Sequence, residues 1–166
     1  KKVYDFSSGI RAISSSIRRS IPQYLDSKIH HNNMMSLVIA KIQANISGYD
    51  AAVMLDERGF VAELNDTNLF MVKEGSIFTP FAHACLPGIT RQTFIDLFKE
   101  NQINIFERDL SLVEFINADL VFATGTNGEI TPVTEIDGRS INCDKNFLEK
   151  IKNLFEAKLP SLCEPL

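Results

Sequence analysis

Two ionisable side chains stand out as possible chemical groups, Lys28 in "LDSKIHHNN" and Glu63 in "FVAELND". A lysine amine can attack an aldehyde, although a lone lysine just before a helix is most often a surface residue. Glu63 is flanked by apolar residues of a predicted strand, where a carboxylate is costly unless a positive group meets it. Its side chain therefore either points into solvent from the strand end or pairs with a cationic ligand atom.

The stretch "ACLPGITRQTF", residues 84–94, predicts a helix that starts without an acidic residue in its first turn. Backbone N–H groups of Gly88, Ile89 and Thr90 would point beyond that helix N-terminus, an arrangement that binds phosphate. Glycine at 88 would let an anion approach the main chain closely. The alternative is an ordinary helix start capped by Thr90.

A second loop follows a predicted buried strand in "FATGTNGEITPV", residues 122–133. It contains two hydroxyls and two glycines, so it is either a tight turn or a second site for a small anion. In the second interpretation Thr126 supplies both a hydroxyl and an N–H group.

Taken together, these stretches supply an amine, a carboxylate and two anion sites. Pyridoxal 5′-phosphate needs that set, because it has an aldehyde for a lysine, a pyridine nitrogen to be kept protonated, and a phosphate. The sequence therefore predicts a site for pyridoxal phosphate.

The sequence resembles the class IV (fold type IV) pyridoxal-phosphate-dependent aminotransferases, which include branched-chain aminotransferases, D-amino-acid aminotransferases and aminodeoxychorismate lyases. The family signature matches residues 63–91, "ELNDTNLFMVKEGSIFTPFAHACLPGITR", and the resemblance covers roughly residues 20–158. One position departs from the signature, Asn65, where a small residue is usual. The matching positions are Glu63, Asn68, Leu69, Phe70, Ile77, Thr79, Leu86, Gly88, Ile89 and Arg91.

The resemblance implies an α+β fold, the large cofactor-binding domain of the family, with mixed β-sheets (a pseudo-barrel) surrounded by helices. It implies that Lys28 carries the cofactor and moves the substrate proton, and that Glu63 pairs with the ring nitrogen. Leu86 would pack against the ring face. The phosphate would be bound by Gly88, Ile89 and Thr90. Gly125, Thr126 and Asn127 would form a second loop, which contacts the phosphate and the substrate carboxylate.

The implied reaction is amino-group transfer between a branched-chain amino acid and 2-oxoglutarate, favoured within the family by "LPGITR" and "GTNGEITPV". Asn33 stands where branched-chain enzymes often carry a tyrosine, so the subfamily stays open. The alternatives are D-amino-acid transamination, aminodeoxychorismate lyase chemistry, or a domain without activity. The family also implies a homodimer.

The start of the chain bears on its domain organisation. It begins with Lys1 rather than Met, close to where the family's smaller N-terminal domain should end. We therefore expect residues 1–166 to form one domain, the large C-terminal one, without the smaller domain that supplies much of the substrate pocket.

Composition narrows the possible partners and the compartment. The net charge of −4 and the lack of a Lys/Arg cluster argue against a nucleic-acid partner, and we interpret Arg18-Arg19 as solvated surface. The sequence contains no run of 18 apolar residues, so it predicts no membrane-spanning helix. Three cysteines without CxxC spacing predict neither disulfides nor a metal site, which favours the cytoplasm.

Periodicity and turn residues predict the elements that must position these groups. One helix is expected at 32–47 and ends at Gly48, because Met35, Val38, Ile39, Ile42 and Ile46 recur at helical spacing. Residues 14–20 are a strand or a loop. Further helices are expected at 89–100, 111–117 and 145–158, the first with Ile89, Phe94, Leu97 and Phe98 near one face. Strands 50–55, 60–64, 68–72 and 76–79 are expected to form an antiparallel meander, followed by strands 103–108, 119–125, 129–136 and 139–142. The last two are expected to be joined by a hairpin turn at Asp137-Gly138. His30 and His31 are interpreted as half-buried turn residues.

Overall fold

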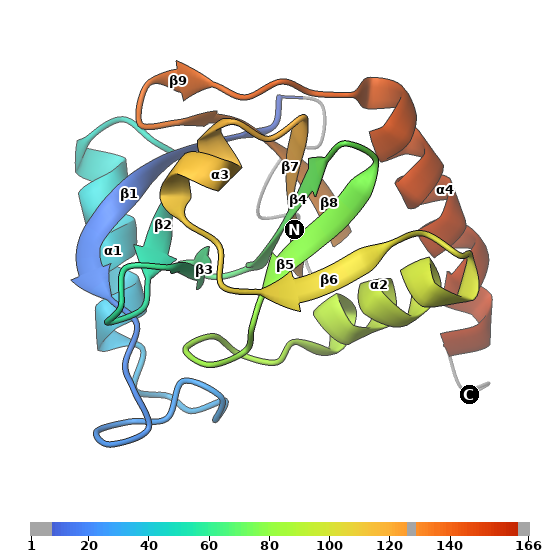
Figure 1. Cartoon of the computed structure of the whole chain (residues 1–166). Coiled ribbons are helices and arrows are strands. Elements are labelled where there is room, and N and C mark those ends of the chain that lie inside the picture. The colour runs from blue at the N-terminus through green and yellow to red at the C-terminus, as the bar shows by residue number, and fades with distance from the viewer. Residues whose placement is uncertain (1–7, 126–128, 163–166) are drawn as a thin grey trace.

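The structure, a computed structural model, describes residues 8–125 and 129–162. Within these residues nine strands form one mixed, curled sheet accompanied by four helices, an α+β fold (Figure 1). The strands are β1 (Ile10–Arg18), β2 (Ala51–Leu55), β3 (Val61–Leu64), β4 (Asn68–Lys73), β5 (Ser76–Pro80), β6 (Ile105–Arg108), β7 (Leu120–Gly125), β8 (Glu129–Ile136) and β9 (Arg139–Ser140). The helices are α1 (Met35–Ile46), α2 (Ile89–Glu100), α3 (Leu112–Ile116) and α4 (Lys145–Leu162).

The strands lie in the order β3-β2-β1-β8-β7-β4-β5-β6, with β9 paired to β8. Strand β1 runs parallel to β2 and β8, strand β6 runs parallel to β5, and the other pairs are antiparallel. The predicted four-strand meander is therefore wrong. Strands β2 and β3 form one hairpin and β4 and β5 another, but β4 already has β5 and β7 as neighbours, so neither of its edges is available to β3.

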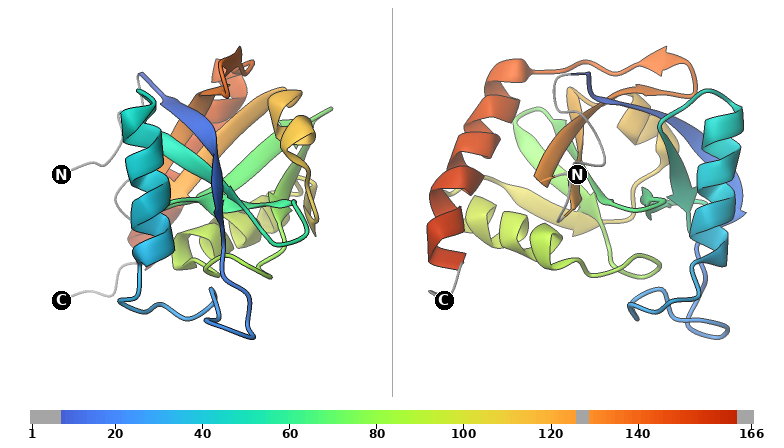
Figure 2. Two further views of the ribbon diagram at one scale, coloured as in Figure 1. Left: turned by 90° about the vertical axis from the view of Figure 1, so that its left-hand side faces the viewer. Right: turned by 180° about the vertical axis from the view of Figure 1, so that it is seen from behind.

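Three of the helices lie at two sides of the sheet (Figures 1 and 2). Helix α1 packs beside β1 and β2, whereas α2 lies at the opposite side against β6 and β7, with α4 next to it. The short helix α3 lies between these two sides and buries Phe115 in the core. Helix α4 buries Ile151 and Phe155, as its periodicity predicts, and it extends beyond the predicted end through Pro160 to Leu162. None of the helices described here is long and apolar enough to cross a membrane.

Helix α1 is present as predicted, but the apolar residues of its periodicity do not form its buried face. It buries Ala40 and Ala44, which pack with Ala52 and Met54 of β2. The five large apolar residues that define its periodicity are between 42% and 82% exposed. Small side chains let the helix lie close to the strands, and periodicity alone indicates an apolar face without saying what covers it.

A cluster of aromatic rings fixes α2 against the middle of the sheet. Phe70 of β4 stacks on Phe122 of β7 with ring centroids 5.1 Å apart, and Phe94 and Phe98 of α2 are buried against them. Of the four residues expected near one face of this helix, Phe94, Leu97 and Phe98 are buried, whereas Ile89 in the first turn is 87% exposed. The N-terminus of α2 is thereby held near the ends of β4 and β7.

The turn chemistry matches the sequence expectation at two positions. Gly48 follows α1 with φ of +76°, a left-handed helix end. Asp137 and Gly138, with φ of +50° and +74°, form the turn of the β8–β9 hairpin.

Candidate active site

A cavity of about 520 Å³ opens where the β1–α1 loop, the end of β3, the end of β7 and the N-terminus of α2 meet. It brings together residues from segments far apart in the chain. The predicted site residues that line it are Lys28, Glu63, Leu86, Gly88, Ile89, Thr90 and Gly125. The two remaining predicted residues, Thr126 and Asn127, lie outside the described residues.

Glu63 is buried at the centre of this arrangement, with 6% of its surface exposed. Its Oε1 lies 2.8 Å from Nε of Arg19, and its Oε2 accepts a hydrogen bond of 3.1 Å from Nδ2 of Asn68. The solvent-facing interpretation of this carboxylate is therefore wrong. The surface interpretation of Arg19 is wrong too, because its side chain is 8% exposed and also donates to the Ala84 carbonyl at 3.1 Å.

The protonation of Glu63 is balanced between two opposing effects. Burial raises the pKa of its carboxyl from 4.5 to about 7, and the Arg19 guanidinium opposes that rise. A carboxylate can accept about four hydrogen bonds, so the contacts with Arg19 and Asn68 leave acceptor positions for a ligand N–H. A cationic ring nitrogen in the cavity would favour the charged form.

Asn68, at the start of β4, links the carboxylate to the α2 turn. Its Nδ2 also donates to the Leu86 carbonyl at 3.0 Å. Its Oδ1 occupies the space where a Cβ at position 88 would be, closer than side-chain atoms can approach. A side chain at 88 would therefore displace the Asn68 carboxamide, which is a reason for glycine that the sequence did not indicate.

The N-terminus of α2 faces the cavity without a side-chain cap. Gly88 is the N-cap residue, with an extended backbone (φ −62°, ψ 140°), and neither a capping hydrogen bond nor an acidic residue occurs in the first turn. Thr90 lines the cavity instead of capping the helix, so that alternative is wrong. The free N–H groups and the helix dipole leave this end suited to an anion.

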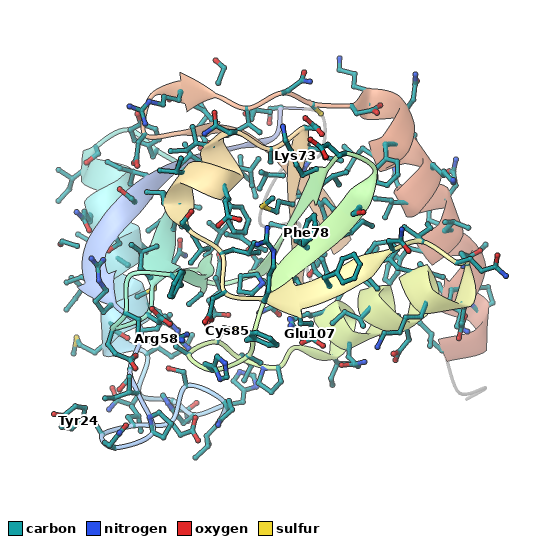
Figure 3. All side chains as sticks on the ribbon, viewed as in Figure 1. Tyr24, Arg58, Lys73, Phe78, Cys85 and Glu107 are labelled. Carbon is teal, nitrogen blue, oxygen red and sulfur yellow. The ribbon has the colours of Figure 1, made fainter. Side chains whose placement is uncertain are left out.

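Lys28 lies on the loop between β1 and α1, which projects from the sheet with Tyr24 near its tip (Figure 3). Its side chain is 45% exposed, and Nζ lies 3.6 Å from Oδ2 of Asp26. Lys28 thus combines the two predicted properties, since it is a surface residue and it lines the cavity. His30 lines the cavity beside it and is exposed, not half-buried as predicted.

The end of β7 contributes Thr124 and Gly125 to the cavity wall. Thr124 is 2% exposed, and its Oγ1 has no hydrogen-bond partner among the described residues. A Cβ at position 125 would approach Cγ2 of Thr67 to 2.9 Å. The sequence did not single out Thr124, because a threonine in a buried strand usually bonds to the backbone.

These features fit pyridoxal phosphate as the occupant. A buried carboxylate stands ready for a ring N–H, an uncapped helix N-terminus and an unpaired hydroxyl suit a phosphate, and a lysine lies at the rim. In the part of the chain described, no three His, Cys, Asp or Glu side chains gather in a way that could hold a metal ion.

Comparison with known proteins places the chain among amino-transferases. The model of the family "Amino-transferase class IV" matches residues 2–136. The chain is 50% identical to branched-chain-amino-acid aminotransferase-like protein 2 of Arabidopsis thaliana over 139 residues, which are 84% of this chain and 25% of that protein. It is 44% identical over 153 residues to the putative branched-chain-amino-acid aminotransferase of Methanocaldococcus jannaschii, covering 88% of this chain and 53% of the relative.

A solved structure shows the same fold. The branched-chain amino acid aminotransferase of Thermobaculum terrenum, in its PLP-form (holo-form), matches with a TM-score of 0.85 and 29% identity, over 89% of this chain and 50% of that one. The chain thus spans about half the length of that enzyme and of the M. jannaschii relative, and a quarter of the A. thaliana one. Because the family model matches most of its length, the chain belongs to the class IV aminotransferase family.

Proposed function

We propose that this chain binds pyridoxal 5′-phosphate and forms the cofactor-binding part of an aminotransferase that moves an amino group from a branched-chain amino acid to 2-oxoglutarate. The observation that carries the proposal is the cavity in which Lys28, the buried Glu63 carboxylate and the uncapped α2 N-terminus converge. When bound, pyridoxal phosphate supplies an electron sink that makes the substrate Cα acidic.

Glu63 holds the proton on the ring nitrogen in this proposal. Its carboxylate would accept a hydrogen bond from N1–H, while Arg19 favours the charged form of the carboxylate and Asn68 fixes its orientation. A protonated ring nitrogen withdraws electrons more strongly, so the placement of this acid lowers the barrier to proton removal from Cα.

The remaining residues bind and orient the cofactor. The N–H groups of Ile89 and Thr90 would bind the phosphate at the positive end of α2, whereas the Gly88 N–H already donates to the Leu86 carbonyl at 2.8 Å. Leu86 packs against the ring face. Thr126 and Asn127, which follow Gly125, are proposed to close the phosphate and substrate-carboxylate side of the pocket.

Lys28 is proposed as the amine that attaches the cofactor and then transfers the proton at the substrate Cα. To act, its Nζ must leave the exposed ion pair with Asp26 and lose a proton. Such a pair is weak in solvent, so leaving it costs less than about 1 kcal/mol. Lys28 is the one amine among the described residues that line the cavity.

We also propose that residues 1–166 form a single domain, the large domain of the family, and that the protein is a cytoplasmic homodimer. Support for further contacts comes from the exposed apolar face of α1, which includes Met35 and Ile46. Support for the compartment comes from Cys85 and Cys143, which are free thiols in the structure.

The test is an absorbance titration of the purified chain with pyridoxal phosphate, followed by addition of L-leucine, L-isoleucine or L-valine. The proposal expects a visible band of lysine-bound cofactor, lost when the amino acid converts the cofactor to its amine form. Conversion by D-alanine instead would indicate a D-amino-acid enzyme, and production of pyruvate from 4-amino-4-deoxychorismate would indicate the lyase. Binding without any conversion would leave a cofactor-binding domain without activity, and absence of binding would contradict the proposal.

A further inference from the structure

Thr124 contains a buried polar atom that the fold does not satisfy. Its side chain is 2% exposed, and Oγ1 has no partner among the described residues. A hydroxyl buried without a hydrogen bond is destabilising, so native structures seldom retain one without a reason. Thr79, which is equally buried in β5, shows the usual solution, since its hydroxyl donates to the Leu69 carbonyl at 2.7 Å.

The position of Thr124 relates it to the anion-binding end of the cavity. Thr124 pairs directly with Asn68 across the antiparallel β4–β7 ladder, so the two side chains lie on the same face of the sheet. The Asn68 carboxamide in turn fills the space beside Gly88, the N-cap of α2. Thr124 lines the same cavity as Gly88, Ile89 and Thr90.

We propose that Thr124 is a phosphate-binding residue whose hydroxyl donates a hydrogen bond to a phosphate oxygen of the bound cofactor. The inference deepens the proposed function and rests on it. A hydroxyl suits this task because a phosphate monoester offers several strong acceptors, and the hydrogen bond to a charged group is stronger than one to a neutral group. The ligand thereby satisfies an atom that the protein alone leaves unpaired.

The matched test compares Thr124→Val with Thr79→Val, two changes that remove a hydroxyl and keep the shape. For Thr124→Val we expect the Kd for pyridoxal phosphate to rise about tenfold and the Kd for pyridoxal, which lacks the phosphate, to stay unchanged. The melting temperature of the ligand-free Thr124→Val protein should stay level or rise, because no hydrogen bond is lost. Thr79→Val should show the reverse, with a lower melting temperature and an unchanged Kd.

Three results would overturn the inference. The first is an unchanged Kd for pyridoxal phosphate in Thr124→Val, while the unaltered chain still binds the cofactor; this result leaves the proposed function standing. The second is an equal rise in the Kd values for pyridoxal and pyridoxal phosphate, which would place the contact at the ring. The third is failure of the unaltered chain to bind the cofactor, which would remove the proposed function as well.

Discussion

The Arg19 guanidinium and the Glu63 carboxylate form an ion pair of 2.8 Å in which both side chains are more than nine-tenths buried. Arg19 follows the last residue of β1, and Glu63 lies in β3, two strands away in the sheet. The pair therefore joins the start of the Lys28 loop to the strand that carries the acid. It stabilises the charge on Glu63 that the proposed ring-nitrogen contact requires.

We expect Arg19→Met to lower the free energy of unfolding at pH 8, where Glu63 is charged, by up to about 3–5 kcal/mol, because it leaves a buried carboxylate without its partner. Adding Glu63→Gln to Arg19→Met should recover part of this loss, since no charge then remains to be compensated. Denaturant unfolding of the two single variants and the double variant measures the coupling. Arg108→Met provides the control, because Arg108 pairs with Glu114 at an exposed site, where loss of the pair should cost about 1 kcal/mol or less. Equal losses at both sites would contradict the burial argument.

The raised pKa of Glu63 predicts how the stability of the ligand-free protein depends on pH. Below pH 4.5 this carboxyl is neutral in both states, whereas the unfolded chain ionises first as the pH rises and the folded chain ionises near 7. The Glu63 contribution to the unfolding free energy therefore falls between these pH values, by up to about 3 kcal/mol. Urea unfolding at pH 5 and pH 8 should show this fall in the unaltered chain and a smaller one in Glu63→Gln. Identical pH dependence in the two proteins would show that the carboxyl titrates normally.

Gly88→Ala should weaken binding of pyridoxal phosphate by about tenfold or more. The new methyl group would displace the Asn68 carboxamide, which holds both Glu63 and the Leu86 carbonyl, and overpacking of this kind costs about 1–3 kcal/mol. Gly75→Ala is the matched control, because position 75 has a φ of +75° and open space around its Cβ. That control should lose about 1 kcal/mol of stability through backbone strain and keep the cofactor affinity. An unchanged affinity in Gly88→Ala would contradict the assigned role of the α2 turn.

The sequence predicted the local elements more reliably than their neighbours. Strands β2 to β5 and helix α2 lie within about a residue of their expected bounds, because alternating apolar residues and glycine turns mark them locally. The meander failed because the partner of β4 is β7, about fifty residues further along the chain. The buried face of α1 could not be inferred for a related reason, since the pattern of its large residues does not show which surface covers them.

The site residues divide in the same way, into those that a local sequence pattern marks and those that depend on residues far away in the chain. Glu63 and Gly88 belong to a contiguous signature, so the sequence could single them out. Arg19 could not be linked to Glu63 without the fold, because forty-four residues separate them and adjacent arginines usually lie in solvent. The unpaired hydroxyl of Thr124 is visible only when every neighbouring donor and acceptor is placed.

The amine of the site offers the most direct test of the whole account. Incubating the chain with pyridoxal phosphate, reducing it with borohydride and mapping the modified peptides identifies the lysine that carries the cofactor. Lys73 is the matched control, because it is 44% exposed and ion-paired with Asp119, much like Lys28, but lies at the far end of β4 from the cavity (Figure 3). We predict that the reduced cofactor is found mainly on Lys28. This label should be abolished by Lys28→Ala and unchanged by Lys73→Ala. Label spread evenly over exposed lysines, or persisting in Lys28→Ala, would contradict the claim that this cavity holds the cofactor through Lys28.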